Sequence, residues 1–412
     1  MKIAFVVPYV PNQIRTRSYN FIIHLSNLGH EVDVFTVGTG KNDLADAESL
    51  KSKCRNVYYY HQPLWRSLLN SARAVISDKP LQSVYSLQYE LVERLKTIFM
   101  NWKNDRAYDV VHVEHLRGSE YGVFLKSHFP ELPVVWDSVD CISYLFRQAA
   151  SQNRGLFGRF MTRFELGRTQ RAEAKLLNIF DHVLVTSAAD KTALLDTIVN
   201  GTKPASITVL SNGVDQSYFK PNPSITPEPD TLIFSGKMSY HANISMVMYL
   251  VTEIMPIVWN HRPGVRLLIV GKDPSREIKK LAEHPLIHVT GTVEDIRPFL
   301  WKAMVAVAPL VYGAGVQNKI LEAMAVGTPV ITTSKAVQSL GVIPGREVLI
   351  GDTPADFSAA VLHLLENPEV RCAIGEADRT HVQKHHDWNE IAQKLVQVYS
   401  HLDVPADANF ST

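Results

Sequence analysis

Short apolar runs alternate with helical patterns along the chain. In the first half, the runs that predict strands are KIAFVV (2–7), EVDVFTV (31–37), DVVHVE (109–114), PVVWD (133–137) and HVLVTS (182–187). A helix follows the first run from Arg17, with Phe21, Leu25 and Leu28 on one face, and Gly29 ends it as a left-handed cap. Strands that alternate with helices are typical of a parallel sheet covered by helices.

The same alternation starts again in the second half. The predicted strands there are TLIFSG (231–236), VRLLIVG (265–271), IHVTG (287–291), VAVAPL (305–310), PVITT (329–333) and VLIG (348–351). Residues 41–106 stay open, because 86–102 has a helical pattern but NVYYYHQPLW fits a strand or a loop. The sequence thus predicts an α/β protein with two Rossmann-like, doubly wound domains that face each other across a cleft.

The segment SNGVDQSYFKPNPSITPEPD (211–230) has four prolines after an Asn-Gly turn, which is typical of a stiff linker. We therefore predict an N-terminal domain over residues 1–220 and a C-terminal domain over 221–386. An amphipathic C-terminal helix is expected over 387–403, and residues 404–412 are expected to form a flexible tail.

Composition narrows the class of protein without identifying a partner. The chain has 412 residues, 46% hydrophobic and 20% charged, with a formal net charge of +1, so nothing in it calls for nucleic acid. The three cysteines lie far apart without CxxC spacing, which favours a reducing, cytoplasmic location and gives no zinc motif. Pro8 ends the first apolar run too early for a signal peptide, and no uninterrupted apolar run reaches the length of about 18 residues that spans a bilayer.

Ligands of doubly wound sheets bind beyond the carboxyl ends of the strands, so motifs there are informative. In VYGAGVQNKILEAMAVG, Gly313 and Gly315 permit close approach of a ligand, and the helix start at 316–318 offers unpaired N–H groups to phosphate oxygens. Lys319 lies in the first helical turn, where a cation needs a compensating anion, and Glu322 follows at i+3. A carboxylate at Glu322 suits the two hydroxyls of a ribose. The alternative is a surface ion pair beside a simple turn.

Two further strand ends fit a nucleotide. Gly236 and Lys237 follow the first strand of the second half, where a small residue and a point charge suit a pyrophosphate; the alternative is a strand exit with a solvated lysine. The strand exit that includes Thr292 and Val293 offers backbone groups to a base.

Five motifs together resemble those of one enzyme family. NGVD (212–215), FSGKM (234–238), LLIVGKDP (267–274), VTGTVEDIRPFL (289–300) and GAGVQNKILEAMAVGTPVI (313–331) are similar to motifs of the family 4 glycosyltransferases that use nucleotide sugars and have the GT-B fold. The resemblance covers nearly the whole chain and is strongest from residue 181 to 333.

The resemblance implies retaining transfer of a sugar from a nucleotide-diphospho sugar to an acceptor held by the N-terminal domain. It also implies that the C-terminal helix over 387–403 crosses back to join that domain. It matches Glu322 to the carboxylate that holds the donor ribose, and Lys237 and Lys319 to the cationic clamp on the diphosphate. The remaining donor-binding matches are Gly236, Thr292, Val293, Gly313, Gly315, Val316, Gln317 and Asn318. The catalytic matches are His115, Lys237 and Lys319, and for His115 the neighbouring Glu114 and His112 remain alternatives.

The chain also departs from the family pattern. Ala314 stands where many members have a second glutamate, and the loop after the first strand has Asn12, Arg15 and Arg17 in place of glycines. These three residues, with Glu114, His115 and Asp137, are the expected acceptor-side residues. Lys237, Lys319 and the helix start supply positive charge for the leaving diphosphate, so we expect no metal and no other cofactor.

Other interpretations stay open at this point. The basic segment 147–176 is either a long helix packed by one apolar face or a peripheral contact with an anionic membrane at the inner face, where a lipid-linked acceptor would lie. A sugar-nucleotide epimerase and a non-catalytic GT-B protein that binds a nucleotide or stabilises a partner are the alternative functions. A dehydrogenase is disfavoured because no GxGxxG follows the first strand.

Overall fold

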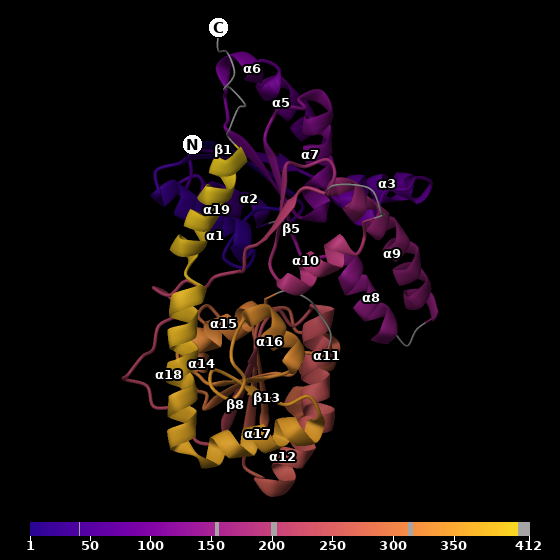
Figure 1. The fold of residues 1–412 in the computed structure, drawn as a ribbon. Helices are drawn as coiled ribbons and strands as arrows, with labels where there is room; N and C mark the ends of the chain where they lie inside the picture. The colour runs from indigo at the N-terminus through magenta and orange to yellow at the C-terminus, as the bar shows by residue number, and fades with distance from the viewer. Residues whose placement is uncertain (41, 153–155, 199–203, 312–315, 403–412) are drawn as a thin grey trace. The chain divides into compact units, whose positions relative to one another are not determined.

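The computed structural model describes residues 1–40, 42–152, 156–198, 204–311 and 316–402 (Figure 1). The chain divides into two compact units, one of residues 1–210 together with the segment from Trp388, and one of residues 211–387. We call them the N-terminal and the C-terminal unit. Each contains a parallel sheet with helices on both faces, so the predicted fold class is confirmed.

The N-terminal unit has a seven-stranded parallel sheet in the order β3-β2-β1-β4-β5-β6-β7. Its strands are β1 Lys2–Val7, β2 Glu31–Gly38, β3 Asn56–His61, β4 Val110–Glu114, β5 Val134–Val139, β6 His182–Val185 and β7 Ser206–Val209. Its helices are α1 Thr16–Asn27, α2 Asp43–Leu50, α3 Leu64–Val75, α4 Leu81–Tyr85, α5 Tyr89–Phe99, α6 Trp102–Asp105, α7 His115–His128, α8 Ile142–Gln152, α9 Leu156–Leu176, α10 Ala188–Leu195 and α19 Trp388–Leu402.

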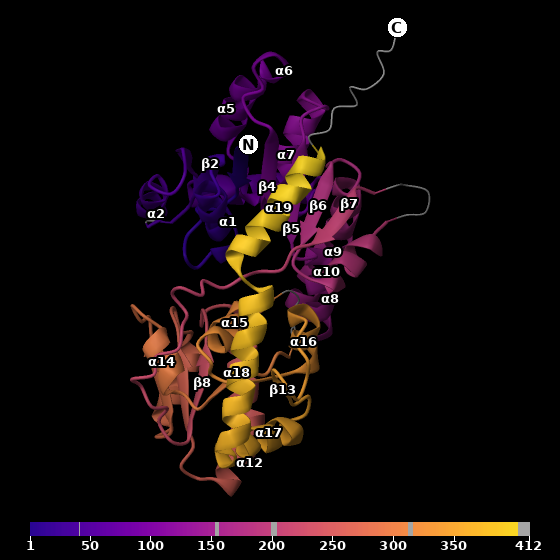
Figure 2. The ribbon, with the colours of Figure 1, turned by 60° about the vertical axis from the view of Figure 1, so that its left-hand side comes forward.

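Alternate residues of each strand enter one of two cores, because successive side chains of a strand point to opposite faces. From β1, Ile3 and Phe5 join the core under α1 and α19, whereas Ala4 and Val6 join the core under α5 and α7. In Figure 2, α19 lies beside α1 over this sheet, although the two helices are far apart in the sequence. The C-terminal segment therefore completes the first core.

The C-terminal unit has a six-stranded parallel sheet in the order β10-β9-β8-β11-β12-β13. Its strands are β8 Thr231–Ser235, β9 Arg266–Val270, β10 Ile287–Gly291, β11 Val305–Ala308, β12 Val330–Thr332 and β13 Leu349–Ile350. Its helices are α11 His241–Tyr249, the π-helical turn η1 Leu250–Ile254, α12 Met255–His261, α13 Arg276–Lys280, the 3₁₀ turn η2 Leu281–Glu283, α14 Arg297–Lys302, α15 Asn318–Ala325, α16 Ser334–Leu340, α17 Pro354–Glu366 and α18 Pro368–His385.

The division between the units lies at 210/211, earlier than the predicted boundary near 220. The proline-rich segment belongs to the C-terminal unit because it is bonded there. Val214 N donates to His386 O at 2.9 Å, and Trp301 Nε1 donates to Lys220 O at 2.9 Å. The return to the N-terminal unit occurs at Trp388, one residue after the predicted start of the last helix.

One helical run, His241–His261, is long and apolar enough to cross a membrane by length and composition. In the structure it is a core element of the C-terminal unit. Met246, Leu250, Ile254 and Val258 are buried within the core of this unit. Its apolar composition is therefore explained by packing.

Candidate active site

The candidate donor site lies where the strand order of the C-terminal unit reverses. The chain moves from β8 outward to β9 and β10, and then returns to place β11 on the other side of β8. The loops that leave β8 and β11 therefore diverge at one edge of the sheet, which is where doubly wound sheets bind ligands. Gly236 and Lys237 leave β8 at this point, and the loop from β11 leads to α15.

Two glycines let the loops after β8 and β9 touch. Gly236 has φ 142° and Gly271 has φ 151°, both in the region that favours glycine. A Cβ on Gly271 would lie 1.7 Å from Gly236 O, and a Cβ on Gly236 would lie 2.8 Å from Asn243 Nδ2. A side chain at position 271 would therefore push the two loops apart, and one at position 236 would displace the Asn243 amide.

Lys319 reaches this loop from the first turn of α15. Its Nζ donates a hydrogen bond to Asn243 Oδ1, and Asn243 Nδ2 donates to Lys237 O at 2.9 Å. The Nζ also lies 4.6 Å from the centre of the Phe234 ring. Asn243 thus connects the segment of Lys237 to that of Lys319, and it positions the Lys319 ammonium group over the end of β8.

Burial changes the protonation of Lys319 and Glu322 in opposite directions. Burial lowers the pKa of Lys319 to about 7 and raises the pKa of Glu322 to about 7, while the attraction between the two charges opposes both shifts. Both side chains are half-buried, so a ligand can still reach them. An anionic ligand group beside Lys319 would favour its ammonium form, and hydrogen-bond donors beside Glu322 would favour its carboxylate form.

The other predicted donor residues are distributed around this edge. Val316 is buried, Gln317 and Asn318 are half-buried at the start of α15, and Asn212 Nδ2 donates to Asn318 Oδ1 at 3.2 Å. Lys237 and Thr292 are exposed and Val293 is half-buried, after β8 and β10 respectively. Gly313 and Gly315 lie outside the described residues.

In the N-terminal unit, His115 stands at the equivalent place. It follows β4, beside the reversal between β1 and β4, and it has φ 63°, a left-handed conformation that is uncommon for a residue with a side chain. Burial and then the Arg117 charge lower the pKa of His115 to about 3, so the ring is neutral. Its Nδ1 accepts a hydrogen bond from Arg117 N at 3.3 Å, which leaves Nε2 as the N–H donor.

The two alternatives to His115 are deeply buried. Glu114 is 1% exposed and accepts a hydrogen bond from Tyr9 Oη at 2.8 Å, and burial, reinforced by the Asp137 charge, raises its pKa to about 7. His112 is fully buried, stacks on Phe5 at 4.4 Å between ring centres, and has its Nδ1 2.7 Å from Tyr399 Oη. Of the three, His115 has the most accessible side chain.

Arg17 and Asp137 form a buried ion pair rather than an open acceptor surface. Arg17 Nε donates to Asp137 Oδ2 at 2.7 Å, and Arg17 Nη1 donates to Leu210 O at 2.9 Å. Although burial opposes ionisation, the Arg17 charge and His112 hold the pKa of Asp137 below its ordinary value. The predicted acceptor role of these two residues is not supported by their burial, because their charges are already paired.

Asn12 and Arg15 shape the loop after β1. Asn12 Oδ1 accepts from Arg15 N at 2.9 Å, and Asn12 Nδ2 donates to Asp46 at 2.7 Å. Arg15 Nη1 donates to Val10 O at 3.0 Å, and its guanidinium lies 5.0 Å from the Tyr9 ring centre. An asparagine that closes its own turn thus replaces the expected glycines.

The sequence did not reveal the roles of Gly271, Tyr9 and Asn243. Gly271 was placed in a strand end, and only the contact with Gly236 gives it a role. No group of three or more His, Cys, Asp or Glu side chains within the described ranges is arranged to hold a metal ion.

Two family models match the chain, one in each half. Residues 14–218 match the family described as Glycosyltransferase Family 4, and residues 229–367 match Glycosyl transferases group 1. Glycogen synthase of Mycobacterium tuberculosis is 24% identical over 309 residues, which cover 72% of this chain and 70% of that protein.

Two solved structures show the same fold. Sucrose-phosphate synthase from Thermosynechococcus elongatus has a TM-score of 0.71 at 20% identity, covering 98% of this chain and 99% of its own. Anabaena HepE in complex with UDP has a TM-score of 0.69 at 15% identity, covering 97% of this chain and 100% of its own. With both units matched by family and by fold, the chain belongs to the family 4 glycosyltransferases of the GT-B fold and is a glycosyltransferase enzyme.

Proposed function

We propose that this enzyme transfers a sugar from a nucleotide-diphospho sugar to an acceptor, with retention of anomeric configuration and without a metal. The observation that carries the proposal is Lys319, a half-buried lysine at the start of α15 whose hydrogen-bond partner is the neutral Asn243. A cation at a helix N-terminus is unfavourable unless an anion is bound beside it. The diphosphate of the donor is that anion.

The residues of the C-terminal unit suit the departure of a nucleoside diphosphate. As the bond between the sugar C1 and the phosphate oxygen breaks, negative charge grows on the diphosphate. Lys319, Lys237 and the N–H groups at the start of α15 stabilise this charge, while Glu322 holds the ribose hydroxyls. The crystal structure of Anabaena HepE is a complex with UDP, which supports a nucleotide donor of this kind here.

The neutral His115 suits a hydrogen bond to a sugar or acceptor hydroxyl better than it suits proton removal. A ring whose pKa is about 3 is a weak base at neutral pH. In the retaining step the acceptor oxygen bonds to C1 on the face that the phosphate leaves, and the acceptor proton passes to the departing phosphate oxygen. No side chain needs to act as a strong base.

The nucleotide sugar is a cytosolic metabolite in this proposal, and the cysteines fit that compartment. Cys54, Cys141 and Cys372 are free thiols. A lipid-linked acceptor would bring the enzyme to the inner face of a membrane. The segment predicted for that contact is divided into α8 and α9, and its Arg168 is buried with only 7% exposure, so this arginine does not offer its charge to a membrane.

The test is a thermal-shift screen of the purified full chain against UDP, GDP, ADP, TDP and CDP, each with and without EDTA. We expect one diphosphate to raise the melting temperature equally in both conditions, because a ligand that binds the native state stabilises it by mass action. The Glu322→Gln variant should bind that diphosphate at least about tenfold more weakly. Glu376→Gln, an exposed glutamate on α18, is the matched control and should bind as the wild type does.

Three results would contradict parts of the proposal. A shift that EDTA removes would overturn metal independence. Unchanged affinity in Glu322→Gln would overturn the ribose contact. If no diphosphate shifts the melting temperature, the nucleotide donor itself is wrong. The anomeric configuration of the product, measured by NMR, tests retention separately.

A further inference from the structure

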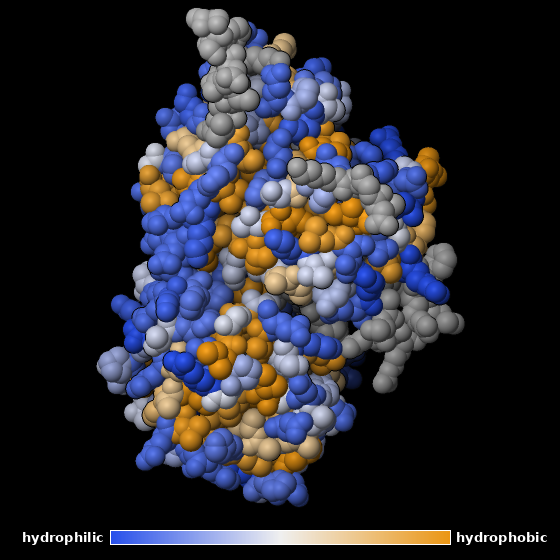
Figure 3. All heavy atoms as spheres, viewed as in Figure 1, coloured by the Kyte–Doolittle hydropathy of each residue, from blue (hydrophilic) through white to orange (hydrophobic). Residues whose placement is uncertain are grey.

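Helix α3 of the N-terminal unit carries its apolar residues on the side that faces solvent. Leu64, Trp65, Leu68 and Leu69 are 59, 61, 65 and 40% exposed, and Val75 and Ile76 at its end are 50 and 92% exposed. At 3.6 residues per turn these positions form one continuous stripe. Figure 3 shows hydrophobic atoms at the surface where α3 lies in Figure 1. We call these six residues the α3 stripe.

The inward face of α3 is polar, so the helix is inverted relative to an ordinary surface helix. Asn70 Nδ2 donates to Val84 O at 3.1 Å and to Leu87 O at 2.9 Å, and Ser67 is fully buried. Arg66 Nη1 donates to Gln88 Oε1 at 2.7 Å. Rotation of α3 to bury the stripe would break these bonds, so the exposure of the stripe is built into the fold.

A buried arginine also holds the end of this helix. Arg168 of α9 donates to Val75 O at 2.7 Å and to Ser77 O, and a third bond of 3.3 Å goes to Lys79 O. Carbonyl groups at a helix C-terminus lack partners within the helix, and a guanidinium satisfies several of them at once. The stripe is therefore presented on a rigid element.

The charges near the stripe are positive. Residues 61–77 contain Arg66 and Arg73 but no aspartate or glutamate. Two acids beside this helix already have cationic partners, because Glu120 pairs with Lys79 at 2.5 Å and Asp78 lies 3.7 Å from Arg171. Arg73 has no acidic partner among the residues that the structure describes. Two guanidinium groups thus stand beside exposed leucine and tryptophan side chains.

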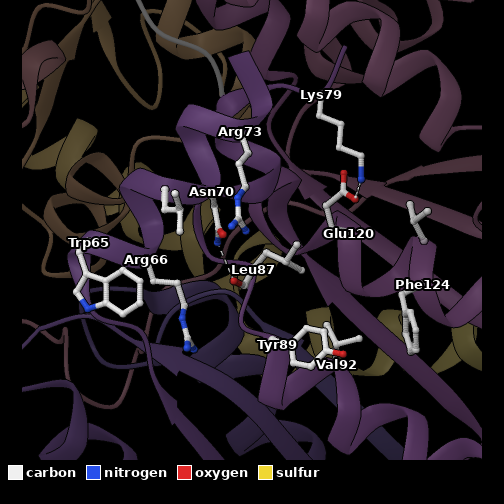
Figure 4. A pocket seen from close by; sticks show the side chains of 12 residues that line it. Trp65, Arg66, Asn70, Arg73, Lys79, Leu87, Tyr89, Val92, Glu120 and Phe124 are labelled. Carbon is white, nitrogen blue, oxygen red and sulfur yellow. Dashed lines mark hydrogen bonds and ion pairs between the residues drawn. The ribbon is translucent and has the colours of Figure 1, made fainter. Parts of the chain in front are cut away.

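A groove between α3, α5 and α7 borders the stripe at Trp65 and Leu69. Its volume is about 710 Å³, and its lining includes the apolar Leu87 and Phe124, the guanidinium groups of Arg66 and Arg73, and the paired charges of Lys79 and Glu120 (Figure 4). Apolar side chains with guanidinium groups at their border are the pattern of a helix that lies in the headgroup region of a bilayer.

We propose that the α3 stripe docks this enzyme on the surface of an anionic lipid bilayer, with its leucines and Trp65 among the acyl chains and Arg66 and Arg73 at the headgroup phosphates. A second copy of the chain fits this surface less well. Two copies of the stripe face to face would bring Arg66 and Arg73 of each toward like charges, and the nearby acids are already paired. Anionic headgroups supply the missing counter-charge.

The test is sedimentation of the full chain with vesicles of phosphatidylcholine alone or mixed with phosphatidylglycerol. We expect binding to the mixed vesicles, and about tenfold weaker partitioning for Leu68→Ser because one exposed leucine no longer inserts. Arg73→Gln should bind about fivefold more weakly and lose part of its salt dependence. Leu44→Ser on the acidic helix α2, where Leu44 is 53% exposed, is the matched control and should bind as the wild type does.

Because Leu68 and Arg73 are exposed, both variants should melt at the wild-type temperature, which circular dichroism checks. Equal sedimentation of wild type and Leu68→Ser, or sedimentation of neither, would overturn the proposal. So would a dimer, seen by analytical ultracentrifugation, that Leu68→Ser dissociates while lipid binding is absent. These results are independent of the nucleotide assay, so failure of this inference and failure of the proposed function can be told apart.

Discussion

At the scale of single residues, Lys319 and Glu322 have opposite reasons to change protonation when a nucleotide binds. Lys319, with a pKa of about 7, is only partly charged near neutral pH, and a diphosphate beside it favours the ammonium form. Glu322, with a pKa of about 7, is partly protonated, and the hydroxyl donors of a ribose favour the carboxylate. Binding therefore takes up a proton at one residue and releases a proton at the other.

This linkage predicts opposite pH profiles for two variants. In Glu322→Gln the Glu322 charge no longer raises the pKa of Lys319, so nucleoside diphosphate affinity should fall as the pH rises, and the fall should begin below the wild-type pKa of about 7 because the ammonium form is lost earlier. In Lys319→Met the Lys319 charge no longer lowers the pKa of Glu322, so affinity should fall as the pH drops, and the fall should begin above the wild-type pKa of about 7. Isothermal titration calorimetry in buffers of different ionisation enthalpy should show proton uptake in the first variant and proton release in the second.

The control for this experiment is Glu376→Gln, which should show the wild-type profile with a maximum near neutral pH. It also accounts for ionisation of the diphosphate itself, which is common to all four proteins. Identical profiles in Glu322→Gln and Lys319→Met would show that these two residues do not carry the linkage.

The sequence could single out Lys319 and Glu322 as candidate site residues because the pattern that marks them is local. Both lie on one helix, about one turn apart, after a glycine loop. Asn243 could not be assigned in the same way. Its bonds to Lys237 and Lys319 join two segments, and Asn243 and Lys319 are 76 residues apart in the sequence. His112 remained an alternative to His115 because the sequence does not show that Tyr399 and Phe5 enclose it.

At the scale of elements, most of the strands that the sequence predicted have an apolar run buried on both faces, and the two half-buried edge strands β10 and β13 were predicted from their apolar letters and the turn residues beside them. β3 stayed open because its tyrosines are only half-buried at the sheet edge, and β7 was not predicted because two of its four residues, Ser206 and Val209, are exposed. Helix α3 lies in the segment 41–106 that the sequence left open, and its outward orientation could not be foreseen, because an apolar stripe gives the same sequence pattern whichever way it faces.

The contact between the loops after β8 and β9 can be tested by a substitution that adds a single methyl group. In Gly271→Ala the new Cβ would lie 1.7 Å from Gly236 O, at a φ of 151° that a side chain rarely adopts. We expect the free energy of unfolding to fall by more than about 3 kcal/mol, measured by urea denaturation. In Gly264→Ala, where nothing lies within 4 Å of the new Cβ, the change should stay below about 1 kcal/mol. Equal denaturation midpoints would show that the two loops move apart at little cost.

At the scale of the whole molecule, the N-terminal unit is built from two segments that are separated in the sequence by the C-terminal unit. The N-terminal unit is complete only after the chain has built the C-terminal unit and returned as α19. Trp388, Ile391 and Leu395 are buried in the same core as Phe21 and Ile22 of α1. The sequence predicted the last helix from its amphipathic pattern, and the return of this helix to the first domain was implied by the resemblance to the GT-B family.

This topology predicts that damage to α19 destabilises the N-terminal unit alone. Leu395 is fully buried, so Leu395→Ala should cost about 2–5 kcal/mol of stability through the lost apolar contact and the cavity left behind. Hydrogen exchange measured by mass spectrometry should rise in β1, β2 and β4 and stay unchanged in β8 and β11, because the C-terminal unit has its own core. The neighbouring Lys394 is exposed, so Lys394→Ala should leave both units as they are. Faster exchange in β8 and β11 of the Leu395→Ala variant would mean that the two units unfold as one.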